Sequence, residues 1–221
     1  MRAPRALFIL LAAVLAARAG ADDRLFVRPW VELEPLVRID PGEYPIPIPA
    51  AERKLLEEAR VLISGMVYGW SFDYTPAERS RGVAESFTLA PTAQVPWGSP
   101  RLRVVETEPS DLRLWARVSY AMNADEAARR SSWESGTAET STGEGQASVM
   151  QGPPGKMASF QEAVRNAIRL NLRARLLDAP RQVTGEVVLW EDPTTTVHAG
   201  VYRTIAKVKF QVREIVPYRI F

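Results

Sequence analysis

Basic side chains and one tryptophan alternate with apolar residues in stretches that are predicted to form β-strands. Because successive side chains of a strand point to opposite faces, these stretches would share one solvated sheet face carrying Arg101, Arg103, Arg113, Trp115, Arg117, Lys207, Lys209 and Arg213. Guanidinium and ammonium groups around an aromatic ring suit an anionic polymer, such as a wall glycan, or a lipid headgroup. An ordinary solvated face, on which long basic side chains prevent edge pairing, has the same pattern. The set is therefore a candidate for partner binding, with the ordinary face as the alternative.

Two pairs of glutamates are spaced two residues apart, Glu32 with Glu34 and Glu106 with Glu108. On a strand this spacing places both carboxyl groups on one face, as the acid and base groups of glycan hydrolysis are placed. Any solvated strand shows the same spacing. A carboxylate-dependent glycan-processing hydrolase is the alternative function that these pairs allow.

The remaining residue types argue against other site chemistry. The chain has no cysteine and a single histidine, His198, whereas a zinc site needs three or four converging ligands. Without cysteine, thiol catalysis, disulfides and iron–sulfur clusters are excluded. The sequence therefore predicts no metal, no cofactor and no catalytic residue, and it favours a non-enzymatic role without settling the question.

The N-terminal residues have the order of a secretory signal peptide. Arg2 and Arg5 precede an apolar run over residues 6–17, and small residues that suit cleavage follow. The run is shorter than the roughly 20 apolar residues of a membrane-spanning helix, and an uncleaved anchor is the alternative. Because the apolar run is short and small residues follow it, we expect residues 1–21 to be removed, and the lack of a cysteine after the run excludes the usual lipid-attached form. The protein would then be exported to the periplasm or envelope, without a lipid anchor on cysteine and without a transmembrane span.

Cleavage changes the net charge. The full chain has 28 basic and 26 acidic side chains, a formal net charge of +2. Residues 1–21 contain three arginines and no acidic residue, so the mature chain has 25 basic against 26 acidic side chains. A charge so close to neutral gives no reason to expect nucleic-acid binding.

Periodic apolar residues predict two amphipathic helices, over about residues 50–64 and 160–177. Strands are predicted over residues 66–74, 83–90, 101–107, 112–122, 183–190 and 201–212. Alternating polarity is typical of antiparallel sheets with one solvated face. The expected fold class is α+β, with two layers: a mainly antiparallel sheet of about five to seven strands, covered by the two helices.

The second helix carries three arginines at four-residue spacing, which are Arg165, Arg169 and Arg173. This spacing places them in one stripe on the helix surface. We expect the stripe to be the solvated side of the helix, with an anionic contact as the alternative.

Residues 22–221 are expected to form a single α+β domain, because about 200 residues suffice for one hydrophobic core. Within it, residues 131–156 are rich in Gly, Ser, Thr and Glu and contain few large apolar side chains. Such a composition buries little surface. It predicts a flexible surface loop.

The export signal, the lack of a catalytic pattern and the predicted basic face together favour a non-enzymatic binding or assembly module of the cell envelope. Its partner would be an anionic envelope polymer or an envelope protein. The contact would use the basic face, the strand that carries Trp115 or the segment 131–156. The sequence indicates neither the oligomeric state nor the identity of the partner.

Overall fold

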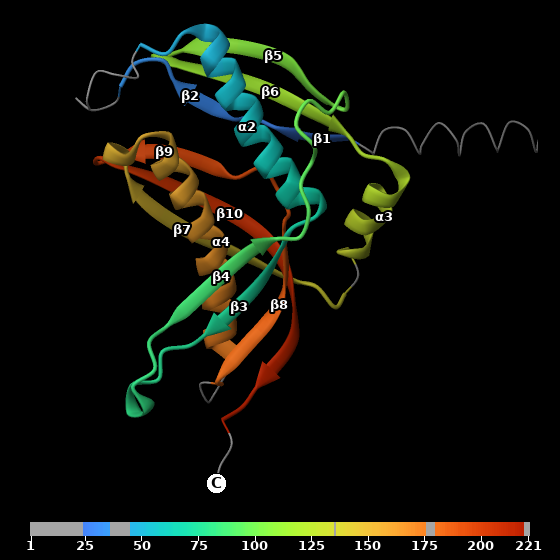
Figure 1. Ribbon diagram of the computed structural model, residues 1–221, viewed down its shortest axis with the longest axis vertical. Helices are drawn as coiled ribbons and strands as arrows, with labels where there is room; N and C mark the ends of the chain where they lie inside the picture. Colours follow the sequence, from blue (N-terminus) through green and yellow to red (C-terminus); the bar gives the residue numbers. More distant parts are fainter. Residues whose placement is uncertain (1–23, 36–44, 135, 176–179, 219–221) are drawn as a thin grey trace, which may run out of the picture.

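The computed structural model describes residues 24–35, 45–134, 136–175 and 180–218 (Figure 1). Within these residues the chain forms three α-helices, two 3-10 helices and ten strands in two antiparallel sheets. The predicted α+β class with antiparallel strands is confirmed. In the part of the chain that the structure describes, no helix is long and apolar enough to span a membrane. The predicted signal peptide falls outside the described residues.

The smaller sheet has four strands, with β6 at its centre. β5 pairs with one edge of β6, while β1 and β2 follow one another along the other edge. The strands are β1 (Arg24–Val27), β2 (Trp30–Glu32), β5 (Leu102–Ser110) and β6 (Arg113–Ala121). Pro29 lies between β1 and β2 and has no N–H to give to a ladder, which fits the break between these two short strands.

Helix α2 (Ile48–Val67) covers the inner face of the smaller sheet. Its apolar stripe, including Leu55 and Leu62, is buried in one core with Leu114 and Val118 of β6. A proline in the first helical turn is tolerated, because the N–H that it lacks has no partner within the helix there. The helix then leads directly into β3, so it connects the two sheets (Figure 1).

The larger sheet has six strands in the order β4-β3-β8-β10-β7, with β9 also paired to β10. The strands are β3 (Trp70–Thr75), β4 (Ser86–Pro91), β7 (Glu139–Ser148), β8 (Gln182–Leu189), β9 (Thr194–His198) and β10 (Val201–Val216). β10 pairs first with β9 and then with β8. The remaining elements are α3 (Ala124–Ser132), α4 (Pro153–Arg175) and the short helices η1 (Arg79–Arg81) and η2 (Val149–Gln151). Helix α4 lies across the larger sheet (Figure 1).

The prediction of a flexible loop over residues 131–156 is wrong. β7 occupies the middle of this range and pairs with β10 along its whole length. Gly143 and Gly145 bring the strand into direct contact with α4: a β-carbon on Gly143 would lie 2.2 Å from the carbonyl oxygen of Ala163. Large apolar side chains are rare here because two backbones approach each other, so that glycine is the residue that fits.

The helices agree with the sequence prediction better than the sheets do. Helices α2 and α4 are the two predicted amphipathic helices, and both begin before the predicted residue. The ten strands exceed the expected number because β1, β2 and β9 are short and β7 lacks an apolar pattern. Alternation shows which two faces a strand has but not which sheet it joins. One sheet was therefore expected where the structure has two.

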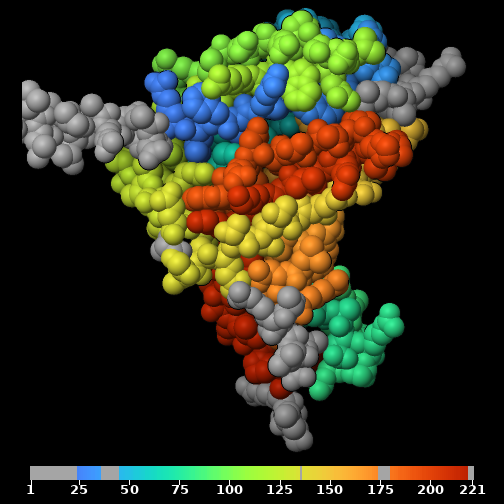
Figure 2. All heavy atoms as spheres, turned by 180° about the vertical axis from the view of Figure 1, so that it is seen from behind, coloured from blue at the N-terminus to red at the C-terminus, as the bar shows by residue number. Residues whose placement is uncertain are grey.

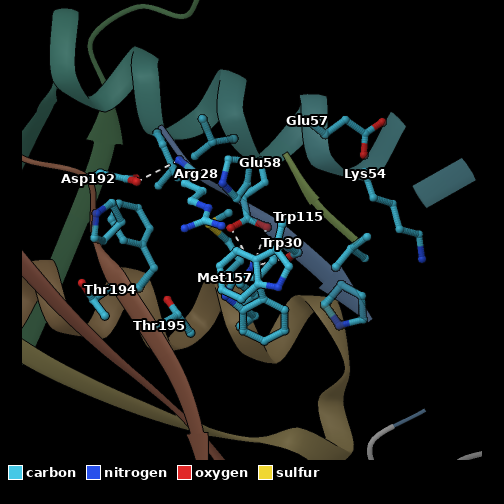
Figure 3. Close-up of a pocket in the computed structure, with 18 of the residues that line it drawn as sticks. Arg28, Trp30, Lys54, Glu57, Glu58, Trp115, Met157, Asp192, Thr194 and Thr195 are labelled. Atoms are coloured by element: carbon cyan, nitrogen blue, oxygen red, sulfur yellow. Dashed lines mark hydrogen bonds and ion pairs between the residues drawn. The ribbon is translucent and has the colours of Figure 1, made fainter. Parts of the chain in front are cut away.

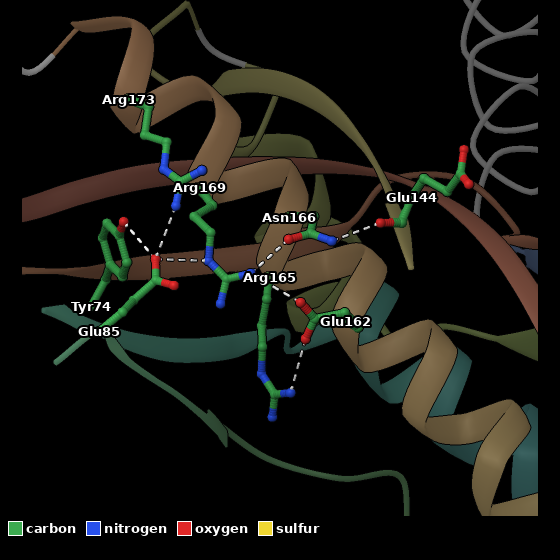
Figure 4. A network of polar contacts seen from close by, with 8 residues as sticks. All are labelled: Tyr74, Glu85, Glu144, Glu162, Arg165, Asn166, Arg169 and Arg173. Carbon is green, nitrogen blue, oxygen red and sulfur yellow. Dashed lines mark hydrogen bonds and ion pairs between the residues drawn. The ribbon is translucent and has the colours of Figure 1, made fainter. Parts of the chain in front are cut away.

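The three arginines of α4, which are Arg165, Arg169 and Arg173, pair with carboxylates (Figure 4). Arg169 donates to Glu162 of the same helix at 2.9 Å and lies 3.1 Å from Glu85, which precedes β4. Glu85 also accepts a hydrogen bond from Tyr74 of β3 at 2.9 Å. The stripe is thus more than a solvated helix side, because it ties α4 to the hairpin of β3 and β4.

Candidate functional site

The eight residues predicted for partner binding do not share one face. Arg101, Arg103, Arg113, Trp115 and Arg117 lie in or beside β5 and β6 of the smaller sheet, whereas Lys207, Lys209 and Arg213 lie on β10 of the larger sheet. The common face assumed one sheet, and the presence of two sheets corrects it. Contact of any of these residues with a partner stays a prediction.

The predicted residues have contacts within the protein, and four of them form ion pairs or a hydrogen bond that hold their charged groups in place. The ion pairs are Arg101–Glu126, Lys207–Glu191 and Arg213–Glu186. Lys209 donates to the carbonyl oxygen of Trp133 at 2.8 Å, and its ammonium lies 3.9 Å from the centroid of the Trp190 ring. These contacts reduce the positive charge that β10 presents, so the larger sheet offers little basic surface.

The residues around Trp115 form a stacked row on the smaller sheet. The guanidinium of Arg28 lies 5.2 Å from the centroid of the Trp115 ring, and that of Arg117 lies 4.8 Å from the Phe26 ring. An arginine over an aromatic face is attracted by the ring quadrupole. Arg28 also pairs with Glu108 at 3.1 Å. Of the eight residues predicted to share a basic face, Trp115 and Arg117 therefore do lie next to each other, on β6.

Two adjoining pockets open beside this row. The first, which we call the junction pocket, has a volume of about 500 Å³ and is lined by residues of β2, α2, the start of α4 and the segment leading into β9. The second, the sheet pocket, has a volume of about 420 Å³ and lies over β5 and β6. Arg28 and Trp115 line both pockets, and we call the combined feature the Arg28–Trp115 groove.

An ion pair between the buried Lys156 and the partly buried Glu58 stands in the wall of the junction pocket, where Figure 3 labels Glu58. Lys156 of α4 is 6% exposed, and its ammonium lies 2.8 Å from the carboxylate of Glu58 on α2. The same ammonium lies 3.9 Å from the centroid of the Trp30 ring. The guanidinium of Arg113 lies 4.2 Å from the same ring centroid. Burial raises the pKa of the Glu58 carboxyl, and the charge and hydrogen bond of Lys156 offset this rise only in part.

Side chains from outside the smaller sheet satisfy the backbone edge of β1 and β2. The N–H of Arg28 donates to Asp192 at 2.8 Å, and the carbonyl oxygen of Trp30 accepts a hydrogen bond from Lys156. Backbone groups at a sheet edge otherwise pair with water or with another strand. Figure 2 shows the N-terminal strands in blue beside the red strands of the larger sheet. The two sheets are therefore joined by side chains at the place where the groove lies.

Asp192 stands at the wall of the junction pocket, just before β9. Asp192 is exposed as a whole residue, but the protein atoms around its carboxyl desolvate it and raise its pKa to about 6; the N–H of Arg28 and the charge of Lys156 oppose this, and the charge of Glu58 adds to it. Above that pH the group is a carboxylate. The pocket therefore carries a negative charge at this wall at neutral pH.

Replacing Lys156 with methionine is expected to destabilise the protein by about 3 kcal/mol, because the Glu58 carboxyl would stay buried without its cation. Methionine retains most of the volume of the lysine stem, so lost packing contributes little. The double variant Lys156→Met with Glu58→Met removes both charges and should recover much of the stability. Urea unfolding followed by tryptophan fluorescence measures both variants. A single variant as stable as the wild type would contradict a buried pair.

The glutamate pairs that allowed a hydrolase are placed differently from one another. Glu32 is 2% exposed and accepts a hydrogen bond from Tyr202 at 2.9 Å, whereas Glu34 is exposed. Glu106 and Glu108 both line the sheet pocket, where Glu108 is held in an ion pair. Glu32 and Glu34 therefore do not face the same surroundings, whereas Glu106 and Glu108 lie on one surface.

Acidic side chains outnumber basic ones along the groove. The carboxylates are Glu32, Glu57, Glu58, Glu106, Glu108 and Asp192, and the basic residues are Arg28, Lys54, Arg117 and Lys156. Across the described ranges no group of three His, Asp or Glu side chains could hold a metal ion. The groove therefore has the opposite sign from the basic face that the sequence predicted.

The sequence pointed to Trp115, Arg117 and the glutamates Glu32, Glu106 and Glu108 of the groove, but not to its residues on α2, on α4 and before β9. The signal that was present is a charge within an apolar helical pattern: Glu58 follows Leu55 by three residues, and Lys156 precedes Phe160 by four. A charged residue at such a position faces the core, and there it needs a partner. Nothing local in the sequence relates Asp192 to Arg28.

The fold and the groove define an α+β protein of two antiparallel sheets with a cleft at their junction. A protein-family model matches residues 15–218, so the chain belongs to that family, whose description gives no activity or ligand. The chain is also similar to an "Uncharacterized protein" of Treponema pallidum (strain Nichols), with 24% identity over 98% of this chain and 96% of the relative. No solved structure matches the chain.

Proposed function

We propose that the protein is an exported, non-enzymatic module of the cell envelope that binds a protein partner in the Arg28–Trp115 groove. The groove carries this proposal, since it combines pockets of about 500 and 420 Å³ in one surface feature. Export rests on the N-terminal sequence, in which a basic start, an apolar run and small residues follow one another.

The contacts within the groove suit binding better than catalysis. Three of its six carboxylates have internal partners, in the pairs Glu58–Lys156, Glu108–Arg28 and Glu32–Tyr202. A general acid or base has to come within hydrogen-bond reach of a substrate proton. A carboxylate that already holds a cation or a hydroxyl in place positions the walls of the groove instead.

The form and charge of the groove favour a polypeptide partner. An extended segment advances about 3.3 Å per residue, and it can follow the sheet pocket past Trp115 into the junction pocket. Tryptophan and arginine, which meet at Trp115 and Arg28, are enriched among the residues that contribute most to protein interfaces. The acidic excess disfavours the anionic polymer that a basic face would bind.

Photocrosslinking from single positions tests the proposal. A benzophenone amino acid replaces Arg117 in the sheet pocket or Thr194 in the junction pocket, and Arg79, exposed on η1, is the control position. In cells that produce the protein, both groove positions should give an adduct with the same protein, and the control position should give none. Trp115→Ala is expected to abolish the adducts, because it removes the aromatic face that both pockets share, whereas the matched variant Trp97→Ala, at an exposed tryptophan that lines neither pocket, should leave them unchanged.

Adducts that form equally from all three positions, or that survive Trp115→Ala, would contradict binding in the groove. A protein that retains residues 1–21 and stays in the cytoplasm would contradict export. These two results are independent, so each part of the proposal has its own measurement.

The raised pKa of Asp192, whose carboxyl lines the junction pocket, favours the alternative, a glycan-processing hydrolase. A carboxylic acid that donates a proton near neutral pH needs a raised pKa. Release of products from wall glycan by the purified protein, but not by Asp192→Asn, would replace the binding module with the hydrolase.

A further inference from the structure

We infer that the bound segment is basic and inserts a lysine or arginine side chain into the junction pocket, where its cationic group pairs with the Asp192 carboxylate. The inference rests on the proposed function and specifies the chemistry of the partner. The segment would be extended, with basic and apolar side chains in alternation.

The two carboxylates Glu58 and Asp192 of the junction pocket differ in their partners. Glu58 has a cation, since Lys156 lies 2.8 Å from it. Asp192 accepts a hydrogen bond from the N–H of Arg28 at 2.8 Å, but no ion pair reaches it from the residues that the structure describes. A peptide N–H brings no net charge, so the negative charge of Asp192 stays available to a ligand.

The surroundings of Asp192 also favour a cationic group. Figure 3 shows Asp192 and Thr194 on the opposite side of the pocket from Glu57 and Lys54. An ammonium or guanidinium group has several N–H donors and needs acceptors for them. The two oxygens of the Asp192 carboxylate are such acceptors, whereas the hydroxyl group of Thr195 is already bonded to Thr204 at 2.9 Å.

The way through the pocket to Asp192 is lined by apolar side chains. Pro29, Trp30 and Pro193 line the same cavity as Asp192. Lysine and arginine have apolar stems that bury along such surfaces while the charged group reaches a polar partner. Apolar neighbours on the bound segment would contact Met157 and Phe160, which also line the cavity.

The overall charge of the groove supports the same occupant. Six carboxylates and four basic side chains line its two pockets. This excess attracts a basic segment during encounter and repels an acidic one. Electrostatic complementarity therefore selects among polypeptides, which apolar contact alone would not do.

Fluorescence polarisation with labelled hexapeptides tests the inference on the mature chain. The probes are Leu-Lys-Leu-Lys-Leu-Lys and its analogues with glutamine or glutamate in place of lysine. The lysine peptide should bind more tightly than the glutamine peptide, and the glutamate peptide should not bind. Asp192→Asn should weaken the binding of the lysine peptide by about tenfold or more, which is the effect of losing one charge-assisted contact.

Asp111→Asn is the matched control, because it removes the same charge at an exposed turn whose backbone has φ 52°, a conformation that asparagine tolerates. It should bind the lysine peptide as the wild type does. The inference would be overturned if Asp192→Asn and Asp111→Asn lost the same affinity for the lysine peptide, or if Asp192→Asn lost none. If no peptide binds while the groove positions still give their crosslinked adduct, the basic chemistry is wrong and the proposed function stands. Absence of both signals would reject both.

Discussion

Replacing Gly143 with alanine is expected to destabilise the protein by about 3 kcal/mol or more, because the added methyl group has no free space. Its β-carbon would lie 2.2 Å from the carbonyl oxygen of Ala163 and 2.3 Å from the backbone nitrogen of Ala167. Both atoms belong to the backbone of α4, which cannot turn aside as a flexible side chain can. Moving the helix away would also break the hydrogen bond from Ser141 to the Ala167 carbonyl oxygen, at 2.7 Å.

Urea unfolding measures this effect, and Gly136→Ala is its control. A β-carbon on Gly136 would have no atom within 4 Å, so the control adds the same methyl group without a clash. If Gly143→Ala were as stable as Gly136→Ala, the direct contact between β7 and α4 would be contradicted. The segment would then behave as the loop that its composition predicted.

Replacing Glu126 with glutamine is expected to cost about 3 kcal/mol of stability at neutral pH, because this buried carboxylate organises several donors. Glu126 is 4% exposed. Its donors are the hydroxyl groups of Tyr68 and Tyr120, the guanidinium of Arg101 and the N–H of Asn123. Glutamine has one acceptor oxygen in place of two and leaves the arginine without its counter-charge.

The contribution of Glu126 to the stability of the protein should decrease at acidic pH. Burial opposes its ionisation, but hydrogen bonds from Arg101, Tyr68 and the Asn123 N–H outweigh burial and lower its pKa to about 2, from 4.5. A carboxyl whose pKa is lowered by folding stabilises the protein above the unfolded pKa and loses this contribution as pH falls through the folded pKa. The contribution should therefore be complete at neutral pH and lost between pH 4.5 and about 2.

Urea unfolding of the wild type and of Glu126→Gln, from about pH 7 down to about pH 3, measures this slope. Glu144→Gln is the control, since hydrogen bonds from Arg203 and Gln146 also lower the pKa of Glu144 to about 2, but on the surface. Salt and water screen a surface pair, so its smaller effect should disappear at high salt while that of Glu126 persists. Parallel slopes for the wild type and Glu126→Gln would argue against the buried cluster.

The elements with strong periodicity could be predicted from the sequence. Helices α2 and α4 have apolar stripes, and β6 and β10 alternate, so each was assigned from residues close together in the chain. β7 could not be assigned this way, because Gly143 and Gly145 bury surface without any apolar side chain.

The groove could not be predicted because its contacts join distant parts of the chain. Arg28 meets Asp192 across 164 residues, and Lys156 meets Trp30 across 126. Side-chain alternation decides the two faces of a strand but not its neighbours. The predicted basic face failed for this reason, since its residues were assigned to the right kind of element but to one sheet instead of two.

The close approach of α4 to β7 also determines how the molecule can deform. Because Gly143 and Gly145 place strand backbone against helix backbone at two points, the helix cannot slide along the strand, and α4 moves with the larger sheet as one rigid body. The smaller sheet meets this body through the side chains of a shared core, through the hydrogen bond from Tyr202 to Glu32, and through Asp192 and Lys156. A change in the angle between the two sheets would therefore change the width of the groove, so that the position of the smaller sheet sets the space that a ligand would have.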